Sequence, residues 1–451
     1  MKRCKVNITP AHFIIKIVPL LFWLSSFAMQ AQAQELLTVD DVIRITMQKN
    51  YGILIARDNL QIAENNYSPG NAGFLPSLDV SASLGHSKIN SEQQYADPTR
   101  PAQIRNDAGS DNKNAAAVLS WTIFDGFKMF ASSARLNSLE KMERYNLRRE
   151  IETALADVVL TYYDVVQKKL IMEVDREAVS ISEQRLRIVQ QGYDIGVSSN
   201  LDVLQARVDL NSDRSVFLGQ EIAVADAQSK LMMILARPER DLFTVIDTIN
   251  TEPHLEVEAL RQSLFSRNSD LLIGQQDLAV AGSELSEIRS EIFPSINLTG
   301  SYNYNRSDSQ AGFFKMNETY GYNYGAQLSL NLFNGFNTRR EIQNARLNRR
   351  GKQFYIDELK LNLASDFNAL VLKYGNSLTR LQLEQENVSV ASENVKIALQ
   401  IYEMGSITAL QLREVQKNYI AAKSRLISTA YEVKQHEVGL LRLGGGLVKE
   451  E

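Results

Sequence analysis

Residue types that commonly perform catalysis or bind metals are scarce in this chain. Its 451 residues include one cysteine, Cys4, and four histidines. Because Cys4 is near the N-terminus, the rest of the chain has no thiol for a disulfide scaffold, zinc ribbon, iron–sulfur cluster or nucleophile. His86, His254 and His436 are far apart, and no Ser/His/Asp spacing or glycine-rich phosphate loop accompanies them. The sequence therefore predicts no enzyme, no catalytic residue, no cofactor and no metal site.

The charged residues indicate solvated helix faces. Lys and Arg total 49 against 53 Asp and Glu, and this net charge of −4 gives no reason to expect a nucleic acid partner. Carboxylates in the predicted helices have Lys or Arg nearby, which is typical of exposed pairs along a helix. Function must therefore be sought in the architecture.

Residues 1–33 have the pattern of a signal peptide. An uncharged, mostly apolar run, 17–29, follows a basic start and precedes Ala31-Gln32-Ala33, a small-x-small cleavage site. This run is too short to span a membrane, which needs about 20 residues. We expect a mature chain that starts near Gln34 and is periplasmic, secreted or in an outer membrane.

Two motifs occur twice at one separation along the chain. Phe124-Asp125-Gly126-Phe127 returns as Phe333-Asn334-Gly335-Phe336, and Tyr193…Gly196 returns as Tyr402…Gly405, both at an offset of 209. Upstream, Asn50 pairs with Asn268 and Pro76 pairs with Pro294, both at an offset of 218. The chain is therefore predicted to be two copies of one half, with an insertion in the first copy. The predicted division is signal peptide 1–33, first repeat 34–237, linker 238–255, second repeat 256–445 and tail 446–451.

Each repeat is predicted to contain two strands. Apolar and small polar residues alternate most clearly over 320–332, the period of a strand with two different faces. The predicted strands are 77–87, 114–124, 295–305 and 320–332. Polar loops, 87–114 and 306–319, would join them in pairs.

These strands suit a membrane barrel. Strands of about 10–13 residues fit a tilted membrane strand better than the usual five or six. Tyrosines on the apolar face resemble an interfacial aromatic girdle. They are Tyr302, Tyr304, Tyr320, Tyr322 and Tyr324. A soluble half-buried sheet would give the same alternation, and the signal peptide favours the membrane alternative.

Helices make up the rest of each repeat. Each repeat opens with a single helix, the first with a capping-box start at Thr38 and Asp41. Long proline-free hairpins, 126–237 and 335–443, follow the strands and turn at Gly196 and Gly405. Their first helices would be about 100 Å long, so they must pack on other long helices as coiled coils.

Four strands cannot close a membrane barrel, since the smallest have eight. Unpaired edge groups in lipid would cost several kcal/mol each, so copies of the chain must share one barrel. Two chains would supply eight strands with a filled interior, and three would supply twelve with room for a pore.

The duplicated halves, the paired aromatic-Asp/Asn-Gly-Phe junctions and the Tyr-x-x-Gly tips together resemble the TolC-like outer-membrane factor family, the outer membrane efflux proteins. The resemblance implies an α+β homotrimer with a twelve-stranded barrel in outer-membrane lipid and a periplasmic α-barrel. It implies a passive exit duct for efflux or type I secretion. A periplasmic adaptor and an inner-membrane transporter of RND, ABC or MFS type would deliver the cargo.

The resemblance also implies roles for residues near the tips. Asp202 and Tyr402 match a periplasmic gate, but its arginine is replaced by Ile407. The family's inner acidic ring falls on Gln411 and Glu414, which leaves one carboxylate per chain and suggests a weaker gate or weaker cation preference. The alternative is that Asp202 and Glu414 are solvated helix charges. The adaptor would dock on the tips, at Gly196, Val197, Ser198, Gly405, Ser406 and Ile407.

Two alternatives stay open at this point. An exported coiled-coil structural or adhesive surface protein would explain the helices and the signal peptide, but not the alternating strands with aromatic ends. Within the channel interpretation, the cargo could be drugs, metals or proteins.

Overall fold

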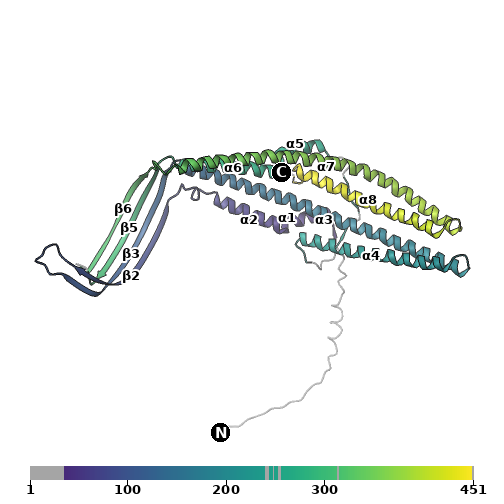
Figure 1. Cartoon of the computed structure of the whole chain (residues 1–451), viewed down its shortest axis with the longest axis horizontal. Coiled ribbons are helices and arrows are strands. Elements are labelled where there is room, and N and C mark those ends of the chain that lie inside the picture. The colour runs from purple at the N-terminus through teal and green to yellow at the C-terminus, as the bar shows by residue number, and fades with distance from the viewer. Residues whose placement is uncertain (1–34, 239–242, 247, 252–254, 312–313, 449–451) are drawn as a thin grey trace, which may run out of the picture.

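The structure is a computed structural model that describes residues 35–238, 243–246, 248–251, 255–311 and 314–448. The predicted signal peptide, 1–33, lies outside the described residues. The molecule is elongated, with a sheet at one end and long helices running from it to the other end (Figure 1). Among the described residues, no helix is long and apolar enough to cross a lipid bilayer.

The predicted helices and strands are present in the predicted order, together with two short strands, β1 and β4, that were not predicted. The helices are α1 (Val39–Lys49), α2 (Tyr51–Asn66), α3 (Lys128–Asp194), α4 (Asn200–Ile234), α5 (Val257–Arg267), α6 (Ser269–Ser290), α7 (Asn337–Glu403) and α8 (Ala409–Leu443). The strands are β1 (Glu35–Leu37), β2 (Ser77–Gln93), β3 (Gln103–Asp125), β4 (Phe243–Val245), β5 (Ser295–Ser309) and β6 (Met316–Ser329).

The bounds of the helices repeat with the two offsets found in the sequence. Both ends of α7 match those of α3 at the first offset, that of the junction motifs, and both ends of α8 match those of α4 in the same way. Both ends of α5 match those of α1 at the second offset, that of Asn50 and Asn268. The duplicated α+β architecture is confirmed.

The opening helix of each repeat is broken, so the prediction of a single helix was wrong. Asn50 ends α1 and caps α2, because its side-chain oxygen accepts the Ile53 N–H at 3.3 Å. Asn268 does the same between α5 and α6 through the Leu271 N–H at 3.1 Å. An Asn side chain competes for backbone groups, which favours a helix end over a helix interior. The predicted capping box of Thr38 and Asp41 is present.

Four strands form an antiparallel sheet in the order β2-β3-β5-β6, so β2 and β6 are its edges. The strands differ in length from the prediction. Most of the predicted loop 87–114 is strand, since β2 continues to Gln93 and β3 begins at Gln103. These extensions are mostly polar, and their few apolar residues, such as Ile89 and Ile104, do not alternate regularly, although the backbone ladder continues. Strand β6 begins at Met316 and ends at Ser329, before the predicted end at 332.

The duplicated junction motif bends the chain from strand into helix. Gly126 and Phe127 have φ values of 69° and 71°, and Gly335 and Phe336 have 68° and 62°. Two successive left-handed residues redirect the chain, and glycine adopts this conformation without steric cost. Asp125 then accepts the Met129 N–H at 2.9 Å and so satisfies an open donor at the start of α3.

The helices form one layer with two open edges. Near the sheet the contact order is α2-α3-α6-α7, and toward the far tips it is α4-α3-α8-α7. Helix α7 therefore lies at an edge along its whole length, opposite first α2 and then α4. Midway along the layer, a buried core holds the unpredicted parallel pair of β1 and β4 against α3, where the Tyr162 hydroxyl donates to the Leu37 carbonyl.

Candidate functional site

The two helical hairpins end in matching tight turns. Gly196 and Gly405 have φ values of 81° and 73°, as expected for glycines that end helices. The Val197 N–H donates to the Gly192 carbonyl at 2.8 Å, and the Ser406 N–H donates to the Ile401 carbonyl at 3.0 Å. Backbone hydrogen bonds therefore close both turns, which lie at the far end of the molecule from the sheet (Figure 1).

The tips expose apolar side chains to solvent. Five of them are between 72% and 77% exposed, namely Ile195, Val197, Leu201, Met404 and Leu410. Ser198 and Ile407 are half-buried, while Ser406 is exposed. Clustered exposed apolar residues of this kind mark interaction surfaces.

Asp202 and Gln411 occupy equivalent capping positions at the start of α4 and α8. The Ser199 N–H and hydroxyl donate to Asp202 Oδ2 at 3.0 and 2.6 Å, and the Thr408 N–H donates to Gln411 Oε1 at 2.9 Å. These bonds from Ser199 hold the pKa of Asp202 below its usual value. Both side chains thus have a structural task whether or not they act in a gate.

Tyr402 joins the two hairpins near the tips. It packs against the buried cluster of Val189 from α3 and Val203 and Ala206 from α4, and burial raises the pKa of its phenol. Arg185 and Asp202 are its charged neighbours, yet Tyr402 and Asp202 share no hydrogen bond among the described residues.

Glu414 differs from the other predicted gate residues. It is exposed and has no ion pair within the described part of the chain.

A buried ion-pair network, which was not predicted from the sequence, lies next to these residues on the side toward the sheet. Arg413 of α8 donates to both carboxylate oxygens of Asp213 of α4, at 2.8 and 2.7 Å. Arg185 of α3, which is 2% exposed, pairs with Asp209 of α4, and Ser182 donates to Asp213. The network therefore links the second hairpin to both helices of the first.

A second link lies farther from the tips. Glu177 of α3 accepts from the Tyr419 hydroxyl at 3.0 Å and pairs with Lys423, both on α8. Asp175, nearby on α3, is buried without a hydrogen bond or ion pair among the described residues. Burial, and then the charge of Asp213, raises the pKa of the Asp175 carboxyl. No sequence signal identifies these partners, because they are 24 to 246 residues apart.

The predicted aromatic girdle lies on one face of the sheet. Tyr302 is opposite Tyr322, Tyr304 is opposite Tyr320, and Tyr324 stacks with Tyr322 at 6.4 Å. The three tyrosines of β6 are between 72% and 85% exposed.

A second aromatic cluster, which we call the junction cluster, was not predicted as a girdle. It surrounds the strand-to-helix junctions and comprises Phe74, Phe124, Phe127, Phe130 and Phe293. Phe333 and Phe336 form a matching edge-to-face pair at the second junction. Phenylalanine in both copies of the junction motif was the available signal.

Comparisons with known proteins agree with this architecture. The profile of the outer membrane efflux protein family matches residues 42–237 and 260–446, so the chain belongs to that family. Its function is efflux, and its location is the outer membrane. Among the described residues, no three His, Cys, Asp or Glu side chains are grouped closely enough to hold a metal ion.

Two curated relatives illustrate the family. The cation efflux system protein CusC of Escherichia coli is 23% identical over 326 residues, which are 69% of this chain and 70% of the relative. The probable efflux pump outer membrane protein TtgC of Pseudomonas putida is 21% identical over 415 residues, which are 90% of this chain and 83% of the relative.

Solved structures show the same fold. The Campylobacter jejuni CmeC outer membrane channel has a TM-score of 0.75 at 15% identity and covers 98% of this chain and 94% of its own. The outer membrane protein VceC of Vibrio cholerae has a TM-score of 0.75 at 15% identity, covering 90% of this chain and 96% of its own.

Proposed function

We propose that three copies of this chain form a homotrimeric exit duct for a tripartite efflux or type I secretion system. The open edges of the protomer carry this proposal. Strands β2 and β6 do not pair with each other, so one sheet cannot close in lipid without unpaired backbone groups. Three sheets would supply twelve strands, enough for an aqueous pore, whereas two would give a filled barrel.

The helical edges have matching apolar stripes. On α7, Leu347, Phe354 and Leu361 recur at every seventh position and are between 56% and 73% exposed. On the opposite edge, α2 exposes Tyr51, Ile55 and Ile62. A heptad apolar repeat is the pattern of a coiled-coil seam, so α7 of one copy would pack against α2 of the next. Toward the tips, α4 exposes a comparable stripe that includes Leu201 and Val208.

The tips would bind a periplasmic adaptor, which connects the duct to an inner-membrane transporter of RND, ABC or MFS type. The exposed apolar residues around Gly196 and Gly405 support this role, since they lie at the end farthest from the sheet and are uncovered in the described protomer.

The ion-pair network of Arg413 would hold the duct closed near the tips. Opening requires the second hairpin to move away from the first, and this movement separates Arg413 from Asp213 and Asp209. Arg413 would thus replace the gate arginine that is missing at Ile407. Asp202, Tyr402 and Gln411 would support the gate by fixing the helix starts and the hairpin contact.

Glu414 would form a ring of three carboxylates in the trimer. Glu414→Gln should reduce the preference for cations in single-channel recordings, and an unchanged ion selectivity would contradict this part of the proposal.

Cargo is tested directly in cells. A deletion strain should become more sensitive to some drugs, dyes or metal salts, and the intact gene should restore resistance. Unchanged sensitivity to all three classes, together with unchanged protein secretion, would contradict the duct. The names of the relatives include both a cation efflux protein and a toluene efflux protein, so they favour no single cargo.

A further inference from the structure

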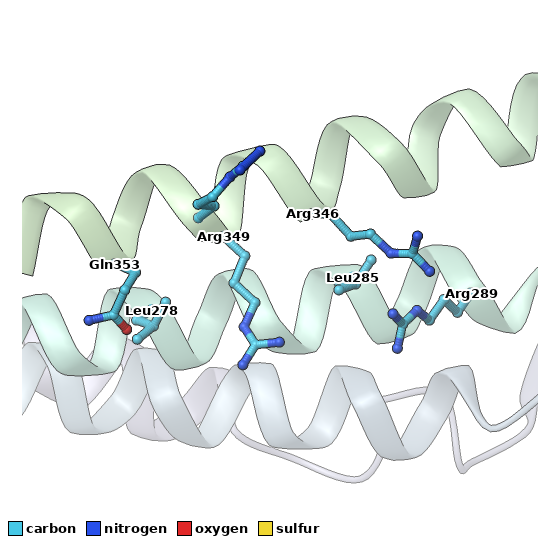
Figure 2. Close-up of a pocket in the computed structure, with 7 residues that line it drawn as sticks. Leu278, Leu285, Arg289, Arg346, Arg349 and Gln353 are labelled. Atoms are coloured by element: carbon cyan, nitrogen blue, oxygen red, sulfur yellow. The ribbon is translucent and has the colours of Figure 1, made fainter.

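A seam inside the chain corresponds to the seam between neighbouring copies of the proposed trimer. Near the sheet, α6 of the second repeat lies between α3 of the first repeat and α7 (Figure 2). Toward the tips, α3 packs against α8 of the second repeat. In the trimer α7 would meet α4 of the next copy, and these two helices are the counterparts of α3 and α8 at the offset of 209. The contacts between α3 and α8 therefore indicate which residues of α7 and α4 meet.

Exposed apolar residues of α4 fit this correspondence. Within the chain, Arg413 and Tyr431 of α8 donate hydrogen bonds to side-chain and backbone oxygens of α3, at 3.3 and 3.4 Å. Their counterparts on α4 are Leu204 and Ile222, which are 50% and 65% exposed in the protomer. Apolar side chains at such positions would be covered by α7 of the next copy, as α3 covers the side chains of α8.

One ion pair of the inner seam has charged counterparts at the seam between copies. Glu177 of α3 pairs with Lys423 of α8. The counterparts are Glu386 of α7 and Arg214 of α4, so an acid again faces a base. Glu386 is exposed and has no hydrogen bond or ion pair among the described residues. Arg214 pairs with Glu183 of its own chain at 2.7 Å, but a guanidinium has several N–H donors and can hold a second carboxylate.

The duplication does not keep charge at every pair. Near the sheet, Arg135 of α3 pairs with Glu287 of α6, and Arg149 pairs with Asp270. At the two offsets, the counterparts of these four residues are Asn344, Pro69, Glu358 and Gly52. Neither counterpart pair joins an acid to a base. The acid and base at Glu386 and Arg214 are therefore a specific feature of the seam near the tips.

A second acid and base lie one heptad nearer the tips. Glu393 follows Glu386 by seven residues on α7, and Arg207 precedes Arg214 by seven residues on α4, which runs in the opposite direction. Residues one heptad apart lie on the same side of a coiled-coil helix, so both acids face both bases in one register. Glu393 and Arg207 are exposed, and neither has a hydrogen bond or ion pair in the described part of the chain.

The inner seam shows that position 207 faces the neighbouring copy. The counterpart of Arg207 is Gln416 of α8, which is 1% exposed and lies beside Ile181 of α3. Arg207 should therefore point toward α7 of the next copy in the trimer. The counterpart of Glu393 is Gln184, so the inner equivalent of this pair consists of two uncharged amides. An ion pair at this level would belong to the seam between copies alone.

We propose that Glu386 and Glu393 of α7 form ion pairs with Arg214 and Arg207, respectively, on α4 of the next copy. Each of the three seams of the trimer would then carry two pairs. Charges beside a coiled-coil seam set the choice and orientation of the partner helix, so these pairs align neighbouring subunits near the gate. The inference rests on the proposed trimer, and its test can fail while the trimer itself is confirmed.

The test exchanges charges in the full-length trimer, purified in detergent, and measures the rate of its dissociation into monomers at one fixed temperature. Neither Glu393 nor Arg207 has a partner in its own protomer, so this pair is tested first. Glu393→Arg or Arg207→Glu alone brings like charges together at all three seams, and each should speed dissociation at least about tenfold. Glu393→Arg with Arg207→Glu restores opposite charges and should return the rate to within about threefold of the wild type.

Glu386→Arg with Arg207→Glu is the matched control. It has the same composition and net charge, but the exchanged residues are one heptad, about 10 Å, out of register. This mismatched variant should dissociate faster than either single variant. In about 1 M sodium chloride the charges are screened, and all variants should approach the rate of the wild type.

Matched and mismatched double variants that dissociate at equal rates would overturn the proposal, as would differences that persist in high salt. If a single variant forms no trimer, recovery of trimers in the matched double variant and not in the mismatched one supports the proposal. A wild type without trimers would overturn the proposed function and this inference with it. Wild-type trimers whose stability does not depend on these charges would overturn the inference alone.

Discussion

Arg413 of α8 and Asp213 of α4 form a two-bonded ion pair, with N···O distances of 2.8 and 2.7 Å. Each side chain is 13% exposed, so the pair is shielded from most solvent. It joins helices that belong to different repeats of the chain. The pair therefore restrains relative movement of the two hairpins near the tips.

Arg413→Gln should open this connection. Removing one partner of a buried ion pair leaves the other charge unpaired, at a cost of up to about 3–5 kcal/mol, with a smaller loss here because the pair is partly exposed. Single-channel recordings should show a larger mean conductance and shorter closed times than in the wild type. Lys417→Gln, an exposed change one turn away on α8, is the matched control. Unchanged conductance in Arg413→Gln would show that the ion-pair network does not hold the gate closed.

Asp175→Asn should change the pH dependence of stability. The folded state raises the pKa of Asp175 above its ordinary value of 3.8, so the carboxyl is more easily charged in the unfolded chain. Stability contributed by the protonated form is then lost as the pH rises from about 4 through the folded pKa. The variant should therefore melt at a higher temperature than the wild type at pH 7, with a smaller loss of melting temperature between pH 4 and 7. A lower melting temperature at pH 7 would show that the carboxylate stabilises the fold.

Ser199→Ala separates capping from gating at Asp202. Loss of the cap should lower the free energy of unfolding by about 1 kcal/mol, whichever partner is removed. Ser199→Ala and Asp202→Ala should therefore lower the melting temperature to a similar extent. If Asp202 also acts in the gate, only Asp202→Ala should raise the conductance. Equal conductance in the two variants would show that Asp202 acts only as a helix cap and has no role in the gate.

Gly126→Ala tests the strand-to-helix junction. A Cβ at Gly126 would collide with the Ser290 carbonyl oxygen, whereas at Gly335 the nearest atom would be 3.9 Å away. Both glycines have positive φ, so Gly335→Ala should cost about 1–2 kcal/mol for backbone strain alone. Gly126→Ala should cost more and reduce the yield of folded protein in the outer membrane. Equal yields of the two variants would mean that the first junction can relax.

The sequence predicted those parts of the fold that depend on local chemistry. The junction motifs and the tips were found because positive φ requires glycine and helix starts require particular side chains, and these requirements occur twice. The ends of the strands were less predictable. Between Ser87 and Asn114 the strand residues are mostly polar, and the few apolar ones do not alternate regularly, so no pattern marks the strands that the backbone nevertheless forms.

The charged parts of the site were not predictable from spacing. Arg413 and Asp213 are 200 residues apart, and each alone resembles an ordinary solvated charge. These features depend on which helices become neighbours, and that is a property of the whole fold.

The central claim, that three chains close one duct, is tested by a disulfide between the two open edges of neighbouring protomers. Gly52 of α2 lies against Glu150 of α3, and the counterpart of Glu150 in α7 is Leu359. Because the two repeats have the same arrangement, Gly52 and Leu359 lie at the same height along the tube. Tyr51 is next to Gly52, and Leu361 is two positions after Leu359, so Tyr51 and Leu361 also lie at nearly the same height. Both are exposed in the protomer, at 70% and 73%, on opposite edges of the helical layer. Beyond the predicted signal peptide the chain has no cysteine, so no native cysteine can form a competing disulfide.

A chain carrying Tyr51→Cys and Leu361→Cys should form dimers and trimers on a non-reducing gel after oxidation in the outer membrane. Each single variant should stay monomeric, as should the double variant after reduction. A double variant that remains monomeric under oxidation would contradict closure through α2 and α7, and bands that stop at the dimer would contradict three-fold assembly.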